Sequence, residues 1–170
     1  LEESTDIQGR IVRSTQIDLF EGCDLVVEAV VENLDVKHSV FKQIESIVSS
    51  DCIVASNTSS LSITSLAAGC NHPERVLGLH FFNPAPLMPL VEIVPAIQTS
   101  EDTPLHLVSL MKNWGKSPVV AKDSPGFIVN RVARPFYGEA LRILDEGIAD
   151  VPTIDTAMRN LGFKMGPFQL

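Results

Sequence analysis

The sequence has few basic residues and no long apolar run, and each shortage excludes a class of protein. Lysines and arginines number 13 against 21 aspartates and glutamates, which gives a formal charge of −8 at pH 7. This balance disfavours nucleic acid or an anionic membrane as the main partner. A phosphorylated ligand stays compatible with it, because a few backbone N–H groups and one or two cations suffice locally. No apolar run approaches the roughly 18 residues that span a bilayer.

Cysteine is also scarce. The three cysteines, Cys23, Cys52 and Cys70, are widely spaced and lie in apolar surroundings. Zinc sites and disulfide frameworks use close or paired spacings such as CxxC, and none occurs here. We therefore expect reduced, buried thiols in an intracellular protein and no metal site. In contrast, 45% of the residues are hydrophobic, which indicates a packed core.

Apolar runs of strand length alternate with helical patterns as far as Ala121. The run Asp24–Val31 is apolar almost throughout, which is typical of a central parallel strand buried on both faces. Alternation of this kind predicts a mainly parallel sheet flanked by helices. The expected strands are Arg10–Ser14, Asp24–Val31, Cys52–Ala55, Arg75–Phe82, Leu90–Val94 and Ser117–Ala121, and the expected helices are Asn33–Val48, Ser62–Ala68 and Thr103–Asn113.

The pattern changes near Lys122–Ser124. Helical spacing follows over Phe127–Glu146 and Thr153–Leu161, with no further strand pattern. We therefore expect an α/β domain over residues 1–122 and the first helices of an all-α domain over residues 123–170. The chain begins at Leu1 rather than Met and ends in an apolar run, so we expect both ends to be cuts through a longer protein.

Two of the apolar runs each carry one residue suited to proton transfer. His80 lies near the end of Arg75–Phe82, and Glu92 lies inside Leu90–Val94. A lone histidine in an apolar run is as often a hydrogen-bonded core residue as a functional one. A buried glutamate is costly unless it is paired, and His80 is the nearest plausible partner. Should the two strands lie side by side, the carboxylate would fix the ring tautomer and make the other nitrogen a better base.

Further polar residues follow the expected strands, at the edge where open α/β sheets bind ligands. Glu32 can accept from ribose hydroxyls or be a solvated loop acid, and Ser59 can face a ligand or cap the next helix. Asn83 belongs to an Asn-Pro turn. Asn130 interrupts an apolar helical run and is either functional or a surface residue. Glu28, within an apolar strand, fits a structural acid that bonds to the backbone.

Four segments together resemble the L-3-hydroxyacyl-CoA dehydrogenase family, including 3-hydroxybutyryl-CoA dehydrogenases. HFFNP combined with PGFIVNR is the specific part of this signature. The resemblance implies a truncated Rossmann-type parallel sheet followed by the start of an all-α domain. The segments are VVEAVVENLDVK (26–37), SNTSSLSIT (56–64), GLHFFNPAPLMPLVEIV (78–94) and DSPGFIVNR (123–131), with MGPFQL (165–170) similar to the family's MGPFEL.

The resemblance implies oxidation of the 3-hydroxyl of a (3S)-3-hydroxyacyl-CoA to a ketone, with hydride passed to NAD, as in fatty-acid degradation. By carry-over, His80 is the general base and Glu92 orients it. Asn130 lies beside His80 and holds substrate oxygens, and Ser59 faces substrate and cofactor. The physical logic agrees, because hydride leaves carbon only as the hydroxyl proton is removed.

On the cofactor side, Glu32, Lys37, Ser59 and Asn83 match positions near the nicotinamide half of NAD. The family's GxGxxG turn should precede Leu1, so we expect the 170-residue chain alone to bind NAD weakly and to have little activity. The resemblance also implies a homodimer, located in a bacterial cytoplasm or a mitochondrial matrix.

Two alternatives stay open. One is a related dehydrogenase of a 3-hydroxy acid that carries no CoA. The other is a non-catalytic binding or assembly module, which would be favoured if His80 and Glu92 were too far apart to hydrogen-bond.

Overall fold

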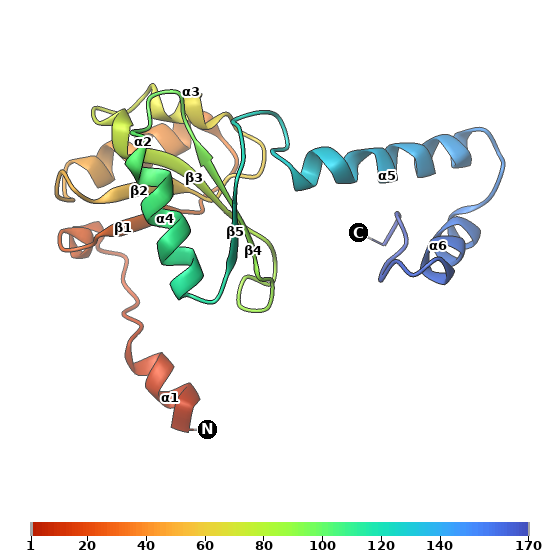
Figure 1. The fold of residues 1–170 in the computed structure, drawn as a ribbon, viewed down its shortest axis with the longest axis horizontal. Coiled ribbons are helices and arrows are strands. Elements are labelled where there is room, and N and C mark those ends of the chain that lie inside the picture. Colours follow the sequence, from red (N-terminus) through yellow and green to blue (C-terminus); the bar gives the residue numbers. More distant parts are fainter. Residues whose placement is uncertain (1, 170) are drawn as a thin grey trace. The chain divides into compact units, whose positions relative to one another are not determined.

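The structure is a computed structural model that describes residues 2–169. The chain forms two compact units, Leu1–Asp123 and Ser124–Leu170. The first contains every strand of the described chain, and the second contains helices and turns (Figure 1). Among the described residues, no helix is both long and apolar enough to cross a bilayer.

The first unit is built on one five-stranded sheet with the strand order β1-β2-β3-β4-β5. The pairs β1–β2, β2–β3 and β4–β5 are parallel, whereas β3 and β4 are antiparallel. The expectation of a mainly parallel sheet in an α/β fold is therefore confirmed, with one antiparallel pair inside it. The strands are β1 (Leu25–Glu28), β2 (Ile53–Ser56), β3 (Val76–Phe81), β4 (Leu90–Pro95) and β5 (Ser117–Val120).

Helices cover both faces of this sheet, with α2 and α3 on one face and α4 on the other (Figure 1). The Asn33 side chain caps α2 by accepting from Val36 N–H at 3.1 Å, and Ser62 caps α3 by accepting from Ser65 N–H at 3.2 Å. Both are residue types that favour helix starts. The elements are α1 (Glu2–Gly9), η1 (Ile17–Phe20), α2 (Leu34–Glu45), α3 (Ile63–Ala67), η2 (Pro73–Arg75) and α4 (Asp102–Asn113).

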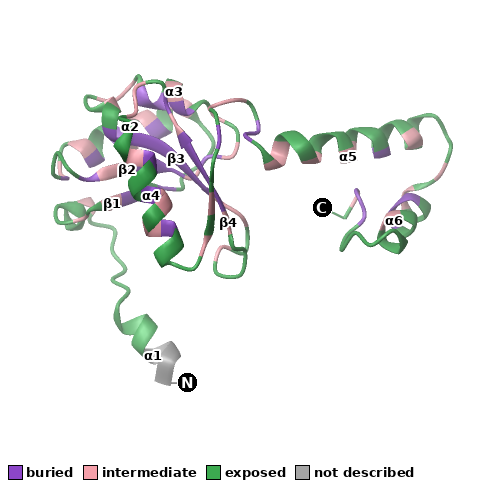
Figure 2. Cartoon of the chain, in the orientation of Figure 1, coloured by how far each residue is buried: buried purple, intermediate pink, exposed green. Residues whose placement is uncertain are grey.

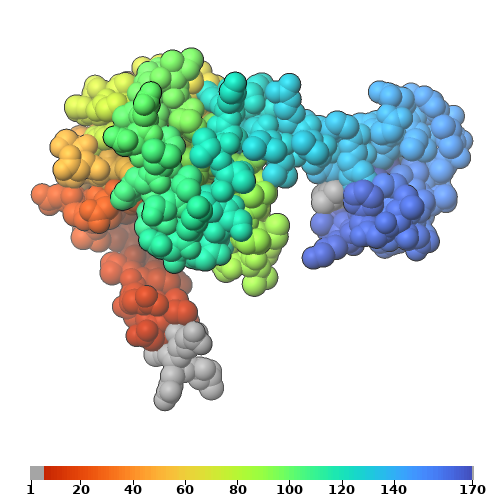
Figure 3. All heavy atoms as spheres, viewed as in Figure 1, coloured from red at the N-terminus to blue at the C-terminus, as the bar shows by residue number. Residues whose placement is uncertain are grey.

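One core cluster lies between the sheet and α4, which covers the strands in the space-filling view of Figure 3. Alternate residues of a strand point to opposite faces, so the neighbours of the core residues on β3 and β4 face α3 instead. Gly78 of β3 lies on that second face, where a Cβ would come within 2.8 Å of the Ile63 side chain. The core cluster comprises Ala55, Leu77, Leu79, Val91, Ile93, Leu107 and Met111, all buried (Figure 2).

One strand expectation is wrong. Residues 11–14 form no strand, because two apolar residues among charged neighbours give too little surface to bury against a sheet. Asp24–Val31, expected to be a central strand, contributes the shorter β1, which pairs in parallel with β2 within the described residues. An apolar run shows that a segment suits a buried strand but not how many neighbours it has.

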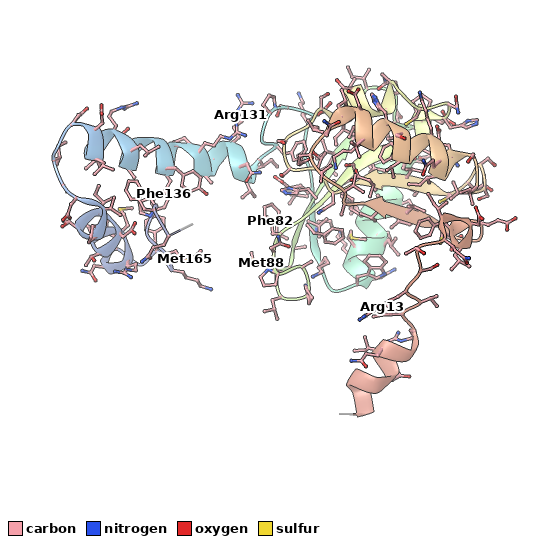
Figure 4. All side chains as sticks on the ribbon, turned by 180° about the vertical axis from the view of Figure 1, so that it is seen from behind. Arg13, Phe82, Met88, Arg131, Phe136 and Met165 are labelled. Atoms are coloured by element: carbon pink, nitrogen blue, oxygen red, sulfur yellow. The ribbon has the colours of Figure 1, made fainter. Side chains whose placement is uncertain are left out.

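The second unit contains α5 (Val129–Asp145) and α6 (Val151–Asn160). Gly147 ends α5 with a positive φ of 67°, a conformation that favours glycine. Phe136 of α5 stacks on Phe163 with ring centroids 4.9 Å apart. Phe136 and Met165, both labelled in Figure 4, line an apolar hollow of about 540 Å³. The hydrophobic face of α5 thus packs on the segment after α6.

Candidate active site

His80 and Glu92 form a buried pair across the antiparallel strands β3 and β4. The register places the two residues directly opposite one another. His80 Nδ1 lies 2.7 Å from Glu92 Oε2. Glu92 is fully buried and His80 is 6% exposed. The strands of His80 and Glu92 do lie side by side, so the predicted pair forms and the buried glutamate has a partner.

The contact fixes how the imidazole can act. With Nδ1–H donating to the carboxylate, the lone pair of the neutral ring lies on Nε2. Glu92 Oε2 lies close enough to offset the positive charge that the ring carries once Nε2 has accepted a proton. The Phe82 ring lies 4.6 Å from the His80 ring and is labelled in Figure 4. This arrangement suits an imidazole that accepts a proton at Nε2 and is stabilised as a cation by Glu92.

A second cluster lies after β1 and β2, where both parallel strands end. The Glu32 carboxylate accepts from Ser59 N–H at 2.8 Å, from Thr58 Oγ1 at 2.8 and 2.9 Å, and from Ser59 Oγ at 3.3 Å. Burial pushes the pKa of Glu32 up, but these hydrogen bonds and the Lys37 charge outweigh it and hold the pKa below its usual value. The side chain is 40% exposed, so an ionised acceptor is presented to solvent.

Beneath this cluster lies a buried ion pair. Lys37 Nζ contacts Glu28 Oε1 at 2.7 Å, and both side chains have at most 1% exposed surface. Glu28 also accepts from Val30 N–H at 2.5 Å, which confirms the backbone bond expected of it. Sequence reasoning gave no partner for this acid. The signal was available, because an acid inside an apolar strand needs a cation and Lys37 follows nine residues later.

Asn57 connects the two clusters. Its Oδ1 accepts from Phe81 N–H at 2.8 Å, so the segment after β2 is bonded to β3 beside His80. Asn83, exposed, lies in the connection between β3 and β4, next to a cis peptide bond with Pro84. Lys116 Nζ donates to the carbonyls of Ala85 at 2.5 Å and Met88 at 2.9 Å in that connection.

The predicted site residues thus lie in four places. His80 is in contact with Glu92. Glu32 accepts a hydrogen bond from Ser59 N–H and forms an ion pair with the buried Lys37. Asn83 belongs to the β3–β4 connection. Asn130 is the second residue of α5 in the second unit, and its proximity to His80 stays a prediction.

Comparison with known families identifies the kind of protein. Residues 2–124 match the model described as "3-hydroxyacyl-CoA dehydrogenase, NAD binding domain", and residues 126–170 match "3-hydroxyacyl-CoA dehydrogenase, C-terminal domain". The chain belongs to the 3-hydroxyacyl-CoA dehydrogenase family. The family resemblance inferred from HFFNP and PGFIVNR is confirmed, as is the Rossmann-like α/β class.

Individual relatives cover the chain almost completely. The mitochondrial hydroxyacyl-coenzyme A dehydrogenase of Sus scrofa is 53% identical over 148 residues, which are 86% of this chain and 47% of that protein. The crystal structure of (S)-3-hydroxybutyryl-CoA dehydrogenase from Ralstonia eutropha matches with a TM-score of 0.92 and 43% identity, over 98% of this chain and 59% of that one. The chain therefore spans about half the length of such dehydrogenases.

One solved relative has a substrate of another kind. The crystal structure of 5-formyl-3-hydroxy-2-methylpyridine 4-carboxylic acid 5-dehydrogenase, named as an NAD⁺-dependent dismutase, has a TM-score of 0.81 and 37% identity. The match covers 84% of this chain and 47% of that one. The dehydrogenase fold thus also serves a substrate whose name contains no CoA.

Proposed function

We propose that the full-length protein carrying this chain is an NAD-dependent 3-hydroxyacyl-CoA dehydrogenase of fatty-acid or related acyl-CoA degradation. It oxidises the 3-hydroxyl of a (3S)-3-hydroxyacyl-CoA to the 3-oxoacyl-CoA. The observation that carries the proposal is the buried 2.7 Å contact between His80 and Glu92, at the same sheet edge as the Glu32 and Ser59 cluster.

His80 is the general base of the proposed reaction. Its Nε2 takes the proton of the substrate 3-hydroxyl, while Nδ1–H stays bonded to Glu92. Glu92 keeps the ring in the productive tautomer and stabilises the imidazolium that forms. Asn130 and Ser59 are proposed to hold the substrate's oxygen atoms, Ser59 from the segment after β2. NAD, when bound, supplies the acceptor for the hydride.

The residues after β1 and β2 fit the nicotinamide half of NAD. Glu32 is ionised and 40% exposed, so its oxygens suit ribose hydroxyls, which are hydrogen-bond donors. Ser59 and Asn83 lie after neighbouring strands of the same edge and offer further polar contacts. Lys37 is 1% exposed, and we propose that it contributes its charge from beneath Glu32. Residues 1–122 are accordingly proposed as part of the NAD-binding domain and residues 123–170 as the start of the helical domain.

We also propose that the full-length protein is a homodimer and is located in a bacterial cytoplasm or a mitochondrial matrix. The name of the Sus scrofa relative describes that protein as mitochondrial. Analytical ultracentrifugation of the full-length protein tests the dimer, because a monomer at micromolar concentration would contradict it.

A second candidate is a dehydrogenase of a substrate without CoA. It is favoured by the 37% identical dehydrogenase of a pyridine carboxylic acid. A non-catalytic module has less support. It would be favoured if His80 and Glu92 were too far apart to hydrogen-bond, but His80 Nδ1 lies 2.7 Å from Glu92 Oε2.

A substrate panel separates these candidates. The full-length protein is mixed with NAD and with (S)-3-hydroxybutyryl-CoA, its (R) isomer, longer (S)-3-hydroxyacyl-CoA esters or free 3-hydroxybutyrate, and NADH formation is followed by absorbance. We expect turnover of the (S) esters at least about a hundredfold above that of the free acid, because CoA binding energy assists the reaction. Preference for the free acid would support the second candidate, and no turnover of any substrate would support the module.

A further inference from the structure

Glu28 is a buried carboxylate that the proposed reaction does not use. Its side chain, at the end of β1, is 0% exposed, which is unusual for a glutamate. Oε1 accepts from Lys37 Nζ at 2.7 Å and from Val30 N–H at 2.5 Å. Oε2 accepts from Ser56 Oγ at 2.7 Å. The carboxylate is therefore the point where β1, α2 and β2 are hydrogen-bonded together.

One route from Glu28 to the cofactor side runs through Lys37. The Lys37 ammonium lies 2.7 Å from Glu28 Oε1, 3.2 Å from the Val30 carbonyl oxygen and 3.5 Å from Glu32 Oε2. Because a buried cation stays close to its counter-charge, Glu28 determines where this ammonium lies. At 3.5 Å, Lys37 attracts the Glu32 carboxylate without the close contact that it makes with Glu28.

A second route runs through hydroxyl groups. Ser56 Oγ donates to Glu28 and accepts from Thr58 N–H at 3.2 Å. Thr58 Oγ1 in turn lies 2.8 Å from Glu32 Oε2. Thr58 is 1% exposed, so this chain of contacts is shielded from water. Both routes start at Glu28 and end at the carboxylate of Glu32.

We infer that Glu28 is a positioning residue for the cofactor side of the site. It holds Lys37 and Ser56 in place and through them sets the orientation of Glu32 toward a ribose. The inference rests on the proposed function, in which Glu32 meets the nicotinamide ribose of NAD. Without the Glu28 charge, the nearest acid to Lys37 is Glu32. The ammonium then moves toward Glu32 and occupies oxygens that would accept from the ribose.

A double-mutant cycle in the full-length protein tests this role. NADH fluorescence titration gives the Kd of the unsubstituted protein, of Glu28→Gln, of Glu32→Gln and of the double variant. We expect Glu28→Gln to raise the Kd about tenfold alone and by less than about twofold in the Glu32→Gln background, because residues acting through one another are not additive. The kcat at saturating NAD stays within about twofold, since the hydrogen bonds of the Glu28 side chain join it to Lys37, Val30 and Ser56.

The controls separate positioning from folding. Glu101→Gln removes an exposed acid whose side chain makes no cap bond, and it leaves the Kd unchanged. Glu28→Asp keeps the charge beside Lys37 and recovers most of the affinity. Should Glu28→Gln not be obtained folded, Ser56→Ala replaces it in the cycle. This variant keeps both charges, and we expect it to raise the Kd about threefold only when Glu32 is present.

The outcomes distinguish two failures. An unchanged Kd in Glu28→Gln, or equal effects of that substitution with and without Glu32, would overturn the positioning role and leave the proposed function standing. Failure of the unsubstituted full-length protein to bind NADH would overturn the proposed function and the positioning role together.

Discussion

His80 Nδ1 and Glu92 Oε2 are 2.7 Å apart, on residues that face one another across the antiparallel strands β3 and β4. Two adjacent strands in fixed register hold this pair more rigidly than loops would. Glu92 is fully buried, so its orientation toward His80 is maintained without competition from water. The proposed chemistry depends on this pairing, and the first prediction removes its acid.

Glu92→Gln keeps the shape of the side chain but removes the charge that stabilises the protonated ring. We expect kcat of the full-length protein with (S)-3-hydroxybutyryl-CoA to fall on the order of a hundredfold, with the KM for NAD changed little. Steady-state kinetics of this variant and of Glu74→Gln, which changes a half-exposed acid, provide the measurement. A kcat equal in both variants would contradict the orienting role.

Asp123 is predicted to stabilise the first unit in a pH-dependent way. Its carboxylate accepts from Ser62 Oγ at 2.9 Å, Ile63 N–H at 3.0 Å and Thr64 N–H at 2.8 Å, at the start of α3. Burial pushes the pKa of Asp123 up, but the hydrogen bonds from Thr64, Ile63 and Ser62 lower it below the ordinary 3.8. The folded chain therefore binds fewer protons than the unfolded chain near that pH.

The stability contributed by Asp123 is therefore complete above its ordinary pKa and is lost as pH falls through the lower folded pKa. Asp123→Asn should reduce the free energy of unfolding by about 1 kcal/mol at pH 7, the usual cost of losing a helix cap. Its thermal midpoint should also fall less than that of the unsubstituted chain between about pH 5 and pH 2. Circular dichroism melts across this range provide the test. Parallel curves for the two chains would contradict the linkage.

Cys70 is predicted to be unreactive in the folded chain. Burial, together with the Glu45 charge, raises the pKa of the Cys70 thiol to about 12. The reactive form is the thiolate, so at pH 8 its fraction should be about a thousandfold lower than for a thiol with a pKa of 9. Mass spectrometry after iodoacetamide treatment, with and without urea, measures this protection. Equal labelling of Cys70 in both conditions would contradict it.

Much of this arrangement could be predicted from apolar periodicity and isolated polar residues. The runs around His80 and Glu92 predicted two strands, and a glutamate costly to bury predicted a partner nearby. The register that makes these two residues opposite was not predictable, because it depends on the antiparallel turn between β3 and β4.

Only part of the buried network of Glu28, Lys37 and Ser56 could be predicted from the sequence. Glu28 was recognised as an acid in an apolar strand, but its cation comes from a helix and its hydroxyl partner from the next strand, 28 residues away. Such contacts depend on how α2 crosses over the sheet, and periodicity does not specify that geometry. The Asn57 bond to Phe81 N–H is another example, because a side chain in a polar loop has many possible partners.

His80→Gln in the full-length protein tests the central claim most directly, with His106→Gln as a control at an exposed histidine of α4. NADH formation from (S)-3-hydroxybutyryl-CoA gives kcat, and NADH fluorescence gives the cofactor Kd. Loss of the general base should lower kcat by about 10²–10⁴-fold, with the Kd within about twofold and His106→Gln unaffected. Undiminished turnover in His80→Gln, or equal losses of turnover and NADH affinity, would contradict the role of His80 as the base.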